Sequence, residues 1–186
     1  PISGAGTLSV WGSSTVLTLT GSNTLTGTIR VAADLTLTNS SASVSTIEIQ
    51  GSSSILKLGA HDVFGNHMSS SPSINFTTTG GTLSNQSNWF NHIGVVTLAD
   101  GAIITTDGNH SSGGTTIAGL NLDGDITLGD NSTANFNATN EGTYGLGTGS
   151  DTGPNRNFTV GSSSTLNINA PLVNGQGGSG GWPTNQ

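Results

Sequence analysis

The sequence has no cysteine, very little positive charge and no long apolar run. Because cysteine is absent, disulfide bonds and thiolate chemistry are excluded, and oxidising extracellular surroundings would leave the chain unchanged. Lys and Arg total 3 against 10 Asp and Glu, so the chain cannot neutralise a phosphate backbone or hold anionic lipid by charge. The composition therefore argues against nucleic acid as a partner and permits an extracellular location.

Long apolar segments are missing throughout the chain. No apolar run approaches the ~18 residues that a membrane-spanning helix needs. No basic leader followed by an apolar stretch opens the chain either. We therefore expect no membrane insertion, and no signal peptide in this form of the chain.

Apolar residues are also scarce, which limits the shape of the core. They make up 31% of the chain, against roughly 45–50% in an average domain by a count that includes Gly. Disorder usually combines low hydrophobicity with high net charge, whereas the net charge here is -7 and Val, Ile and Thr are abundant. Gly, Ser, Asn and Thr disfavour helix, so the composition predicts an all-β fold.

What the sequence does contain is a repeated pattern of two short alternating runs around a corner of small residues. The stretch "TIEIQGSSSILKLGA" has this pattern, and "TLSVWGSSTVLTLTG", "ITLGDNSTANFNAT" and "FTVGSSSTLNINA" repeat it. Alternation places Leu, Ile and Val on one face of a strand and polar residues on the other. The alternating pairs are Leu8/Val10 with Leu17/Leu19, Ile29/Val31 with Leu35/Leu37, Ile47/Ile49 with Leu56/Leu58, Val96/Leu98 with Ile103 or Ile104, Ile126/Leu128 with Ala134/Phe136, and Phe158/Val160 with Leu166/Ile168.

The corners between these runs predict bends, because they lack the Asn-Gly signature of a tight hairpin. A chain that bends repeatedly and keeps one face apolar winds into a β-solenoid, in which each turn pairs in parallel with the last. At roughly 20 residues per turn, we predict one domain over residues 1–186 with about nine turns and ladders of Ser, Thr and Asn. Longer loops interrupt the pattern and contain further expected strands at Ile74 to Phe76 and Ile117 to Leu122.

Three phrases of the sequence are similar to a known repeat. "GAGTLSVWGSSTVLTLTGSNTLTGTIRVAADLTLT", "ILKLGAHDVFG" and "INFTTTGGTLS" resemble the passenger repeats of bacterial autotransporters and the autotransporter-associated β-strand repeat proteins. The resemblance covers mainly residues 4–81. It implies a right-handed parallel β-helix and a secreted rod used for adhesion, display or surface structure, with enzymes in the minority.

The tightest acidic group is a candidate calcium site. "NLDGDITLGDN" contains Asp123, Asp125 and Asp130. Asp123 and Asp125 lie two residues apart on an expected strand, so they could face the same way and share Ca²⁺ through oxygen ligands. The alternative is that all three are solvated turn carboxylates.

Catalytic machinery is not evident in the sequence. A glycan-active β-helix enzyme needs clustered carboxylates with Arg or Lys on one strand face, and such clusters are nearly absent. Ser is so frequent that any Ser/His/Asp pairing would be arbitrary. The histidines lack the converging donors of a zinc site, so exposed loop histidines are the simpler interpretation. We predict a protein that is not an enzyme and has no cofactor. The histidines are His61, His67, His92 and His110.

Aromatic residues are few, which draws attention to Trp89 and Phe90 in "SNWFNH". An exposed Trp could stack on a neutral sugar ring or anchor an interface, because one flat side chain buries a large area at a small entropic cost. Packing of this loop onto the rod is the third interpretation. A glycan therefore remains a candidate partner.

The two ends of the chain lack the charged or helical segments that usually cap a solenoid. An uncapped turn offers unpaired backbone groups and an open apolar column to another chain. We therefore predict a structural subunit of an extracellular filament or bacterial surface fibre that stacks head to tail on itself, its Gly-rich tail (174–186) docking on a neighbouring copy. The stacked copies are either separate subunits or tandem repeats of a longer protein. Adhesion through loops is the alternative, and a glycan-active enzyme comes third. The expected interface residues are Pro1, Ile2, Leu8, Val10, Leu172, Val173 and Trp182.

Overall fold

The computed structural model describes residues 2–21, 23–38, 44–64, 71–77, 80–86, 91–107, 111–112, 115–116, 119–139, 144–148 and 156–176. These residues form strands and turns and contain no helix, as the composition predicts. Accordingly, no helix in this part of the chain is long and apolar enough to cross a membrane.

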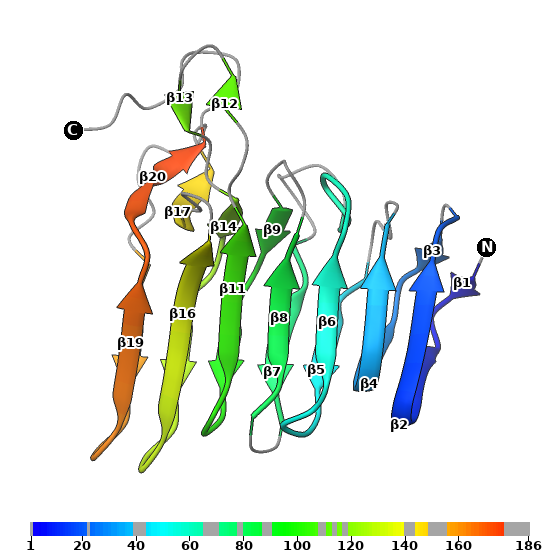
Figure 1. Ribbon diagram of the computed structural model, residues 1–186, viewed down its shortest axis with the longest axis horizontal. Coiled ribbons are helices and arrows are strands. Elements are labelled where there is room, and N and C mark those ends of the chain that lie inside the picture. Colours follow the sequence, from blue (N-terminus) through cyan, green and yellow to red (C-terminus); the bar gives the residue numbers. More distant parts are fainter. Residues whose placement is uncertain are drawn as a thin grey trace.

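The strands form three walls of a parallel β-helix (Figure 1). The top wall contains β1 (Ser3–Gly4), β3 (Thr24–Leu25), β9 (Asn91–Ile93), β14 (Leu120–Leu122), β17 (Tyr144–Thr148) and β20 (Leu172–Gln176). The rear wall contains the first halves of β2 (Thr7–Leu19) and β4 (Thr28–Leu37), then β5 (Thr46–Ile49), β7 (Ser73–Phe76), β10 (Val96–Leu98), β15 (Ile126–Leu128) and β18 (Phe158–Val160). The front wall contains the second halves of β2 and β4, then β6 (Ile55–Leu58), β8 (Thr82–Asn85), β11 (Ile103–Asp107), β16 (Thr133–Thr139) and β19 (Thr165–Asn169).

Every pair of neighbouring strands within these walls is parallel, so the corners are bends, as predicted. The exception lies outside the walls, where β12 (Ser111–Ser112) and β13 (Thr115–Thr116) form an antiparallel hairpin. In Figure 1 the front strands run upward, the rear strands run downward behind them, and successive turns advance from right to left. This arrangement is a right-handed coil, the hand that the family resemblance implies.

The described part of the chain forms seven complete turns, whereas a uniform period predicts nine. The spacing between paired residues varies, from 18 residues between Ile29 and Ile47 to 32 residues between Ile126 and Phe158, and it is largest in the last two turns. Longer connections in the later turns use up chain without adding turns. The expected strand at Ile74 to Phe76 is present as β7. Of the strand expected at Ile117 to Leu122, β14 covers Leu120–Leu122, and residues 117 and 118 lie outside the described residues.

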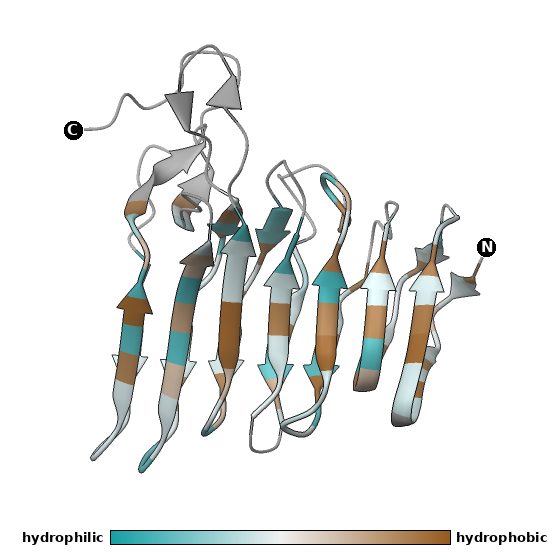
Figure 2. Ribbon diagram, viewed as in Figure 1, coloured by the Kyte–Doolittle hydropathy of each residue, from teal (hydrophilic) through white to brown (hydrophobic). Residues whose placement is uncertain are grey.

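The apolar alternation builds the core by stacking like side chains between turns. In the rear wall, Ile47 pairs with Ile29 on one side and with Ile74 on the other. Figure 2 shows apolar residues as brown bands near the middle of most front strands, in line from one strand to the next. These columns explain why so few apolar residues suffice, because only the inward half of each strand needs them. Residues at most 1% exposed include Ile29, Leu35, Ile47, Leu56, Ile74, Leu83, Val96, Ile104, Ile126 and Phe136.

The Gly-Ser-Ser corners connect the rear wall to the front wall. The third residue has a left-handed backbone in two of them, with φ of 64° at Ser14 and 56° at Ser163, and in the similar corner Gly129-Asp130-Asn131, with φ of 52° at Asn131. That conformation turns the chain sharply without reversing it. Short polar side chains tolerate it better than branched apolar ones, which accounts for the repeated composition of the corners.

Polar side chains on the outer faces of the strands pair between turns. The amide Nδ2 atoms of Asn167 and Asn169 donate to Asn135 and Asn137, each over 3.0 Å. On the rear wall, Arg30 Nε lies 2.6 Å from a carboxylate oxygen of Glu48. These contacts hold successive turns in one register.

Candidate functional site

The first turn leaves its apolar residues half-covered, unlike the turns that follow. Leu8, Leu17 and Leu19 of β2 are partly buried, whereas the residues that pair with them in β4 are at most 1% exposed. The corner of this turn also presents Trp11, 58% exposed, and Val16, 65% exposed. The first turn therefore offers an apolar edge to solvent.

The last complete turn has the same property at the opposite end. Phe158, Leu166 and Ile168 are partly buried, and Val160 is 42% exposed. Their partners one turn earlier, such as Leu128 and Phe136, are at most 1% exposed. Both ends of the apolar column are therefore open in the described part of the chain.

The strands of these two turns are paired on one side only among the described residues. β2 pairs with β4 alone, β18 with β15 and β19 with β16. A strand edge with free N–H and C=O groups is a template for pairing with another strand. Soluble proteins usually protect such edges with Lys or other charged side chains.

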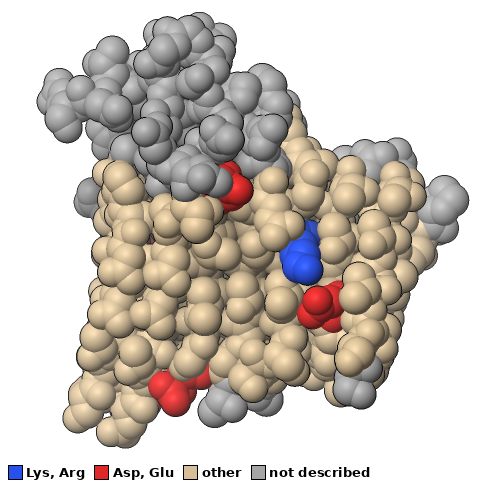
Figure 3. Space-filling view, viewed as in Figure 1, with Lys and Arg blue, Asp and Glu red and all other residues tan. Residues whose placement is uncertain are grey.

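No charge protects the two ends of this protein. Every ionisable side chain lies between Arg30 and Arg156, so residues 1–29 and 157–186 contain no Asp, Glu, Lys, Arg or His. The face seen in Figure 3 agrees, because the few charged groups lie away from the strands at its left and right ends. The position of the charges was a signal available in the sequence, but it gains meaning only when the fold assigns those residues to end turns.

Comparisons with protein-family models, curated proteins and solved structures found no match for this chain. The resemblance to autotransporter repeats therefore stays a prediction from the quoted phrases. Any argument about function rests on the geometry of the chain itself.

The predicted interface residues fall in these end turns where the structure describes them. Ile2 and Leu8 are partly buried near the start, and Leu172, 41% exposed, begins β20. Val10 lies in β2 but is buried at 4%, and the backbone of Val173 lies in β20. Pro1, Trp182, Trp89 and Phe90 lie outside the described residues. Trp11 and Val16, which the sequence reasoning missed, are the most exposed large apolar residues of the first turn.

The three candidate calcium ligands do not converge. Asp125 accepts hydrogen bonds from the backbone N–H and the side-chain amide of Asn157, over 3.0 and 3.2 Å. Asp130 lies at the other end of β15 and accepts from the N–H of Ser162 over 2.6 Å. Asp123 contacts His92 of the preceding turn. Each of the three carboxylates therefore connects its own turn to a neighbouring turn. Among the described residues, no group of three His, Asp or Glu side chains could hold a metal ion.

A buried polar cluster lies on the outer face of the top wall. Asp123 Oδ2 lies 2.9 Å from His92 Nδ1 and accepts from the hydroxyl of Ser71 over 2.6 Å. Asn121 Nδ2 lies 3.3 Å from His92 Nε2. This is not a nucleophilic triad, because the serine hydroxyl contacts the carboxylate and the imidazole nitrogens already have partners. The cluster instead connects β9 and β14 to the segment before β7.

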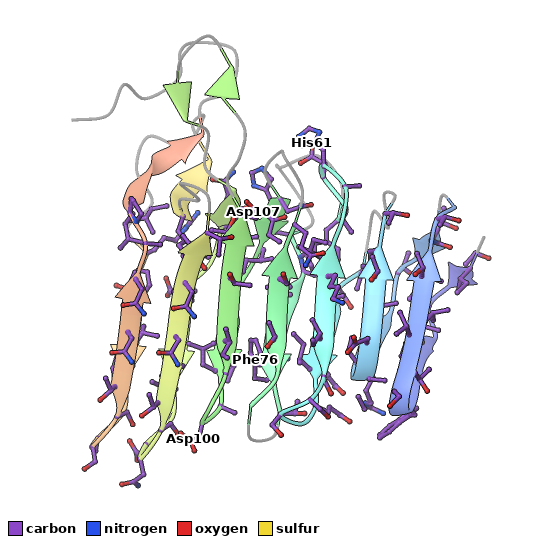
Figure 4. All side chains as sticks on the ribbon, viewed as in Figure 1. His61, Phe76, Asp100 and Asp107 are labelled. Carbon is purple, nitrogen blue, oxygen red and sulfur yellow. The ribbon has the colours of Figure 1, made fainter. Side chains whose placement is uncertain are left out.

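The remaining described ionisable groups are spread over separate edges. Figure 4 shows His61 and Asp107 at the upper edge and Asp100 at a lower corner. His61 lies 3.3 Å from its neighbour Asp62, and Asp100 accepts from the N–H of Thr133 over 2.8 Å. His67 and His110 lie outside the described residues. Within the described part, the end turns are thus the surfaces with the clearest capacity for interaction.

Proposed function

We propose that the protein is a structural subunit of an extracellular filament or cell-surface fibre, and that copies assemble head to tail by continued strand stacking. The observation that carries this proposal is the pair of open, charge-free end turns. An absence of cysteine and a scarcity of titratable groups suit a material exposed to changing surroundings.

The two ends are complementary in chemistry and in strand order. Each end offers one rear strand and one front strand, and each of these runs in the same direction as its counterpart at the other end (Figure 1), with apolar residues facing inward. Continuing the observed columns by one turn places Val10 of one copy against Val160 of the other, and Leu17 against Ile168. Because the first and last turns are different surfaces, the contact is heterologous, and repeating it produces an open filament rather than a closed dimer.

The proposal is tested by the size and shape of the purified protein as its concentration rises. We expect unbranched rods in negative-stain electron micrographs, and a molar mass by light scattering that grows with concentration. A monodisperse monomer at every concentration would contradict the proposal.

A charge pair introduced at the ends tests whether stacking of these turns drives assembly. Thr18 and Asn169 lie on the outer faces of β2 and β19 and meet in the stacked arrangement. Thr18→Lys with Asn169→Lys places like charges opposite each other, so assembly should need a several-fold higher concentration. Thr18→Lys with Asn169→Glu should restore it. The matched control, Thr105→Lys with Thr127→Lys, adds the same charges to middle turns and should assemble like the wild type.

A further inference from the structure

At the C-terminal end of the described solenoid, the top wall extends one strand beyond the rear and front walls. After the seventh turn is completed by β19, the chain returns to the top wall, where β20 pairs with β17 from Tyr144↔Leu172 to Thr148↔Gln176. β20 is therefore the top strand of an eighth turn. In the described part of the chain, that turn has no rear or front strand.

The N-terminal end begins with a top strand of its own. Two residues separate β1 from β2, and two residues likewise separate β3 from β4 and β9 from β10. β1 therefore occupies, in the first turn, the place that β20 occupies in the eighth.

These two facts conflict when one copy stacks on another. If β2 of a second copy pairs with β18 and β19, its first turn becomes the eighth turn of the combined coil. Its β1 then falls at the level already held by β20 of the first copy. Two strands cannot occupy one place, so one of them must leave.

β1 is the strand held less firmly. It has two residues, Ser3 and Gly4, both exposed, and it is joined to β3 mainly by the hydrogen bonds from Thr24 N–H to Ile2 O and from Thr26 N–H to Gly4 O, each 2.9 Å. β20 has five residues and keeps its register with β17 along its whole length. We infer that β20 of one copy displaces β1 of the next and pairs with its β3, so that neighbouring subunits exchange a strand. This inference rests on the proposed head-to-tail assembly.

The register of the exchanged strand follows from the observed pairs. Ile29 and Ile126 occupy the same column of the rear wall, and Leu25 and Leu122 each lie four residues before them. Leu122 aligns through Leu146 with Asn174. Asn174 of one copy therefore takes the place of Gly4 beside Leu25 of the next. Val173 then takes the place of Ser3 beside Thr24.

A cysteine pair tests this register in the intact chain, which has no cysteine of its own. In Thr24→Cys with Val173→Cys, the two Cα atoms belong to adjacent strands about 4.8 Å apart, within the range that a disulfide spans. We expect oxidation of assembled protein to give a ladder of covalent oligomers on a non-reducing gel. The matched control, Thr26→Cys with Val173→Cys, is shifted by two residues and should give little cross-linking.

A disulfide lock tests the displacement itself. Ser3 and Thr24 are paired within one copy, so Ser3→Cys with Thr24→Cys should hold β1 in place when oxidised. We expect the oxidised form to need at least about tenfold more protein to assemble, and reduction to restore the wild-type value. Deleting residues 1–6 vacates the place, so assembly should then occur at a concentration no higher than that of the wild type.

The outcomes separate this inference from the proposal beneath it. If the wild type assembles but the lock has no effect, or the Thr24/Val173 pair does not cross-link, strand exchange is wrong and head-to-tail stacking stands. If the wild type remains a monomer at every concentration, both are wrong.

Discussion

At the scale of single residues, the few buried polar groups connect particular strands of the fold, which the many exposed polar groups do less specifically. Tyr144 is fully buried, its ring meets Phe136 edge-on at 5.2 Å, and its hydroxyl lies 2.7 Å from Asn137 O and 3.0 Å from Ile104 O. One side chain therefore joins the top wall to two strands of the front wall. Burial raises the pKa of Tyr144 well above its ordinary value.

This burial predicts a loss of stability in alkali. The unfolded chain loses the phenol proton near the ordinary pKa of 10.0, whereas the folded chain keeps it. The unfolded state then binds fewer protons, so the free energy of unfolding falls as pH rises above about 10. Because Tyr144 is the sole tyrosine, phenolate absorbance should appear only as the protein unfolds. Absorbance that rises at pH 10 while circular dichroism stays native would contradict this. Tyr144→Phe should abolish the absorbance change.

Asp125 predicts the opposite dependence of stability on pH, because its contribution is lost at low pH. The backbone N–H of Asn157, its side-chain amide and the nearby Arg156 lower the pKa of this carboxyl below its ordinary value of 3.8. Around and below that value the unfolded chain binds the proton first, so this contribution to stability is present above about pH 4 and is lost as pH falls through the folded pKa. Urea midpoints measured from pH 7 to pH 2 should fall less steeply for Asp125→Asn than for the wild type. Equal slopes would show that the carboxylate does not couple turns six and seven.

At the scale of an element, the corner between the top and rear walls brings successive turns unusually close. A Cβ built on Gly124 would meet the backbone of Gly94 and Val95, including the Cα of Val95 at 2.7 Å. Gly94 is in the same position one turn earlier, where a Cβ would lie 2.7 Å from Ser71 O. Glycine is needed here because of the approach of one backbone to another, not because of a left-handed φ.

The two ends of β15 provide a matched pair of substitutions. Gly124→Ala should destabilise the protein by about 1–3 kcal/mol, because backbone atoms must move to admit the methyl group. Gly129→Ala adds the same methyl group where no atom lies within 4 Å, and its effect should stay within about 0.5 kcal/mol. Chemical denaturation of both variants measures the difference. Similar effects would mean that the corner relaxes at no cost.

Polar side chains also occupy buried positions where the columns of apolar residues end. Asn85 pairs in register with Leu58, yet it donates to Thr106 Oγ1 and to the carbonyl of Gly119. Asn91 donates to Ala60 O over 2.9 Å and accepts from Val63 N–H over 2.7 Å. Among the described residues turn four has no top-wall strand, and there the side-chain amide of Asn91 pairs with backbone groups of Ala60 and Val63.

At the scale of the whole molecule, no charged residue lies in the strands of the first turn or in β18 and β19 of the last complete turn, and this governs how assembly responds to solvent. Contact between charge-free ends depends on apolar burial and backbone hydrogen bonds, neither of which is screened by salt. Assembly measured by sedimentation should change less than about threefold between about 0.05 and about 1 M NaCl. Sulfate should strengthen it, because excluded salts favour burial. A steep loss of assembly in NaCl would show that charged groups of the middle turns make the contact.

The alternating runs of the rear and front walls, and the core that they enclose, were predictable from the sequence, whereas most strands of the top wall were not. Period-two alternation is a local property of an extended backbone, so Ile47, Leu56 and Phe136 could be placed inside before any contact was known. The small-residue corners and the low charge likewise pointed to a parallel solenoid with polar ladders.

The number of turns, the partners of the carboxylates and the extra top strand β20 at the C-terminal end depend on the tertiary structure, and no local pattern predicted them. Asp125 meets Asn157 because the intervening loop makes that turn 32 residues long, and no local pattern encodes such a length. The same loops decide that the described chain ends on a top strand, β20, beyond its last complete turn. Contacts between turns depend on the accumulated length of every loop between them, whereas the inward or outward direction of a side chain depends only on its neighbours in the strand.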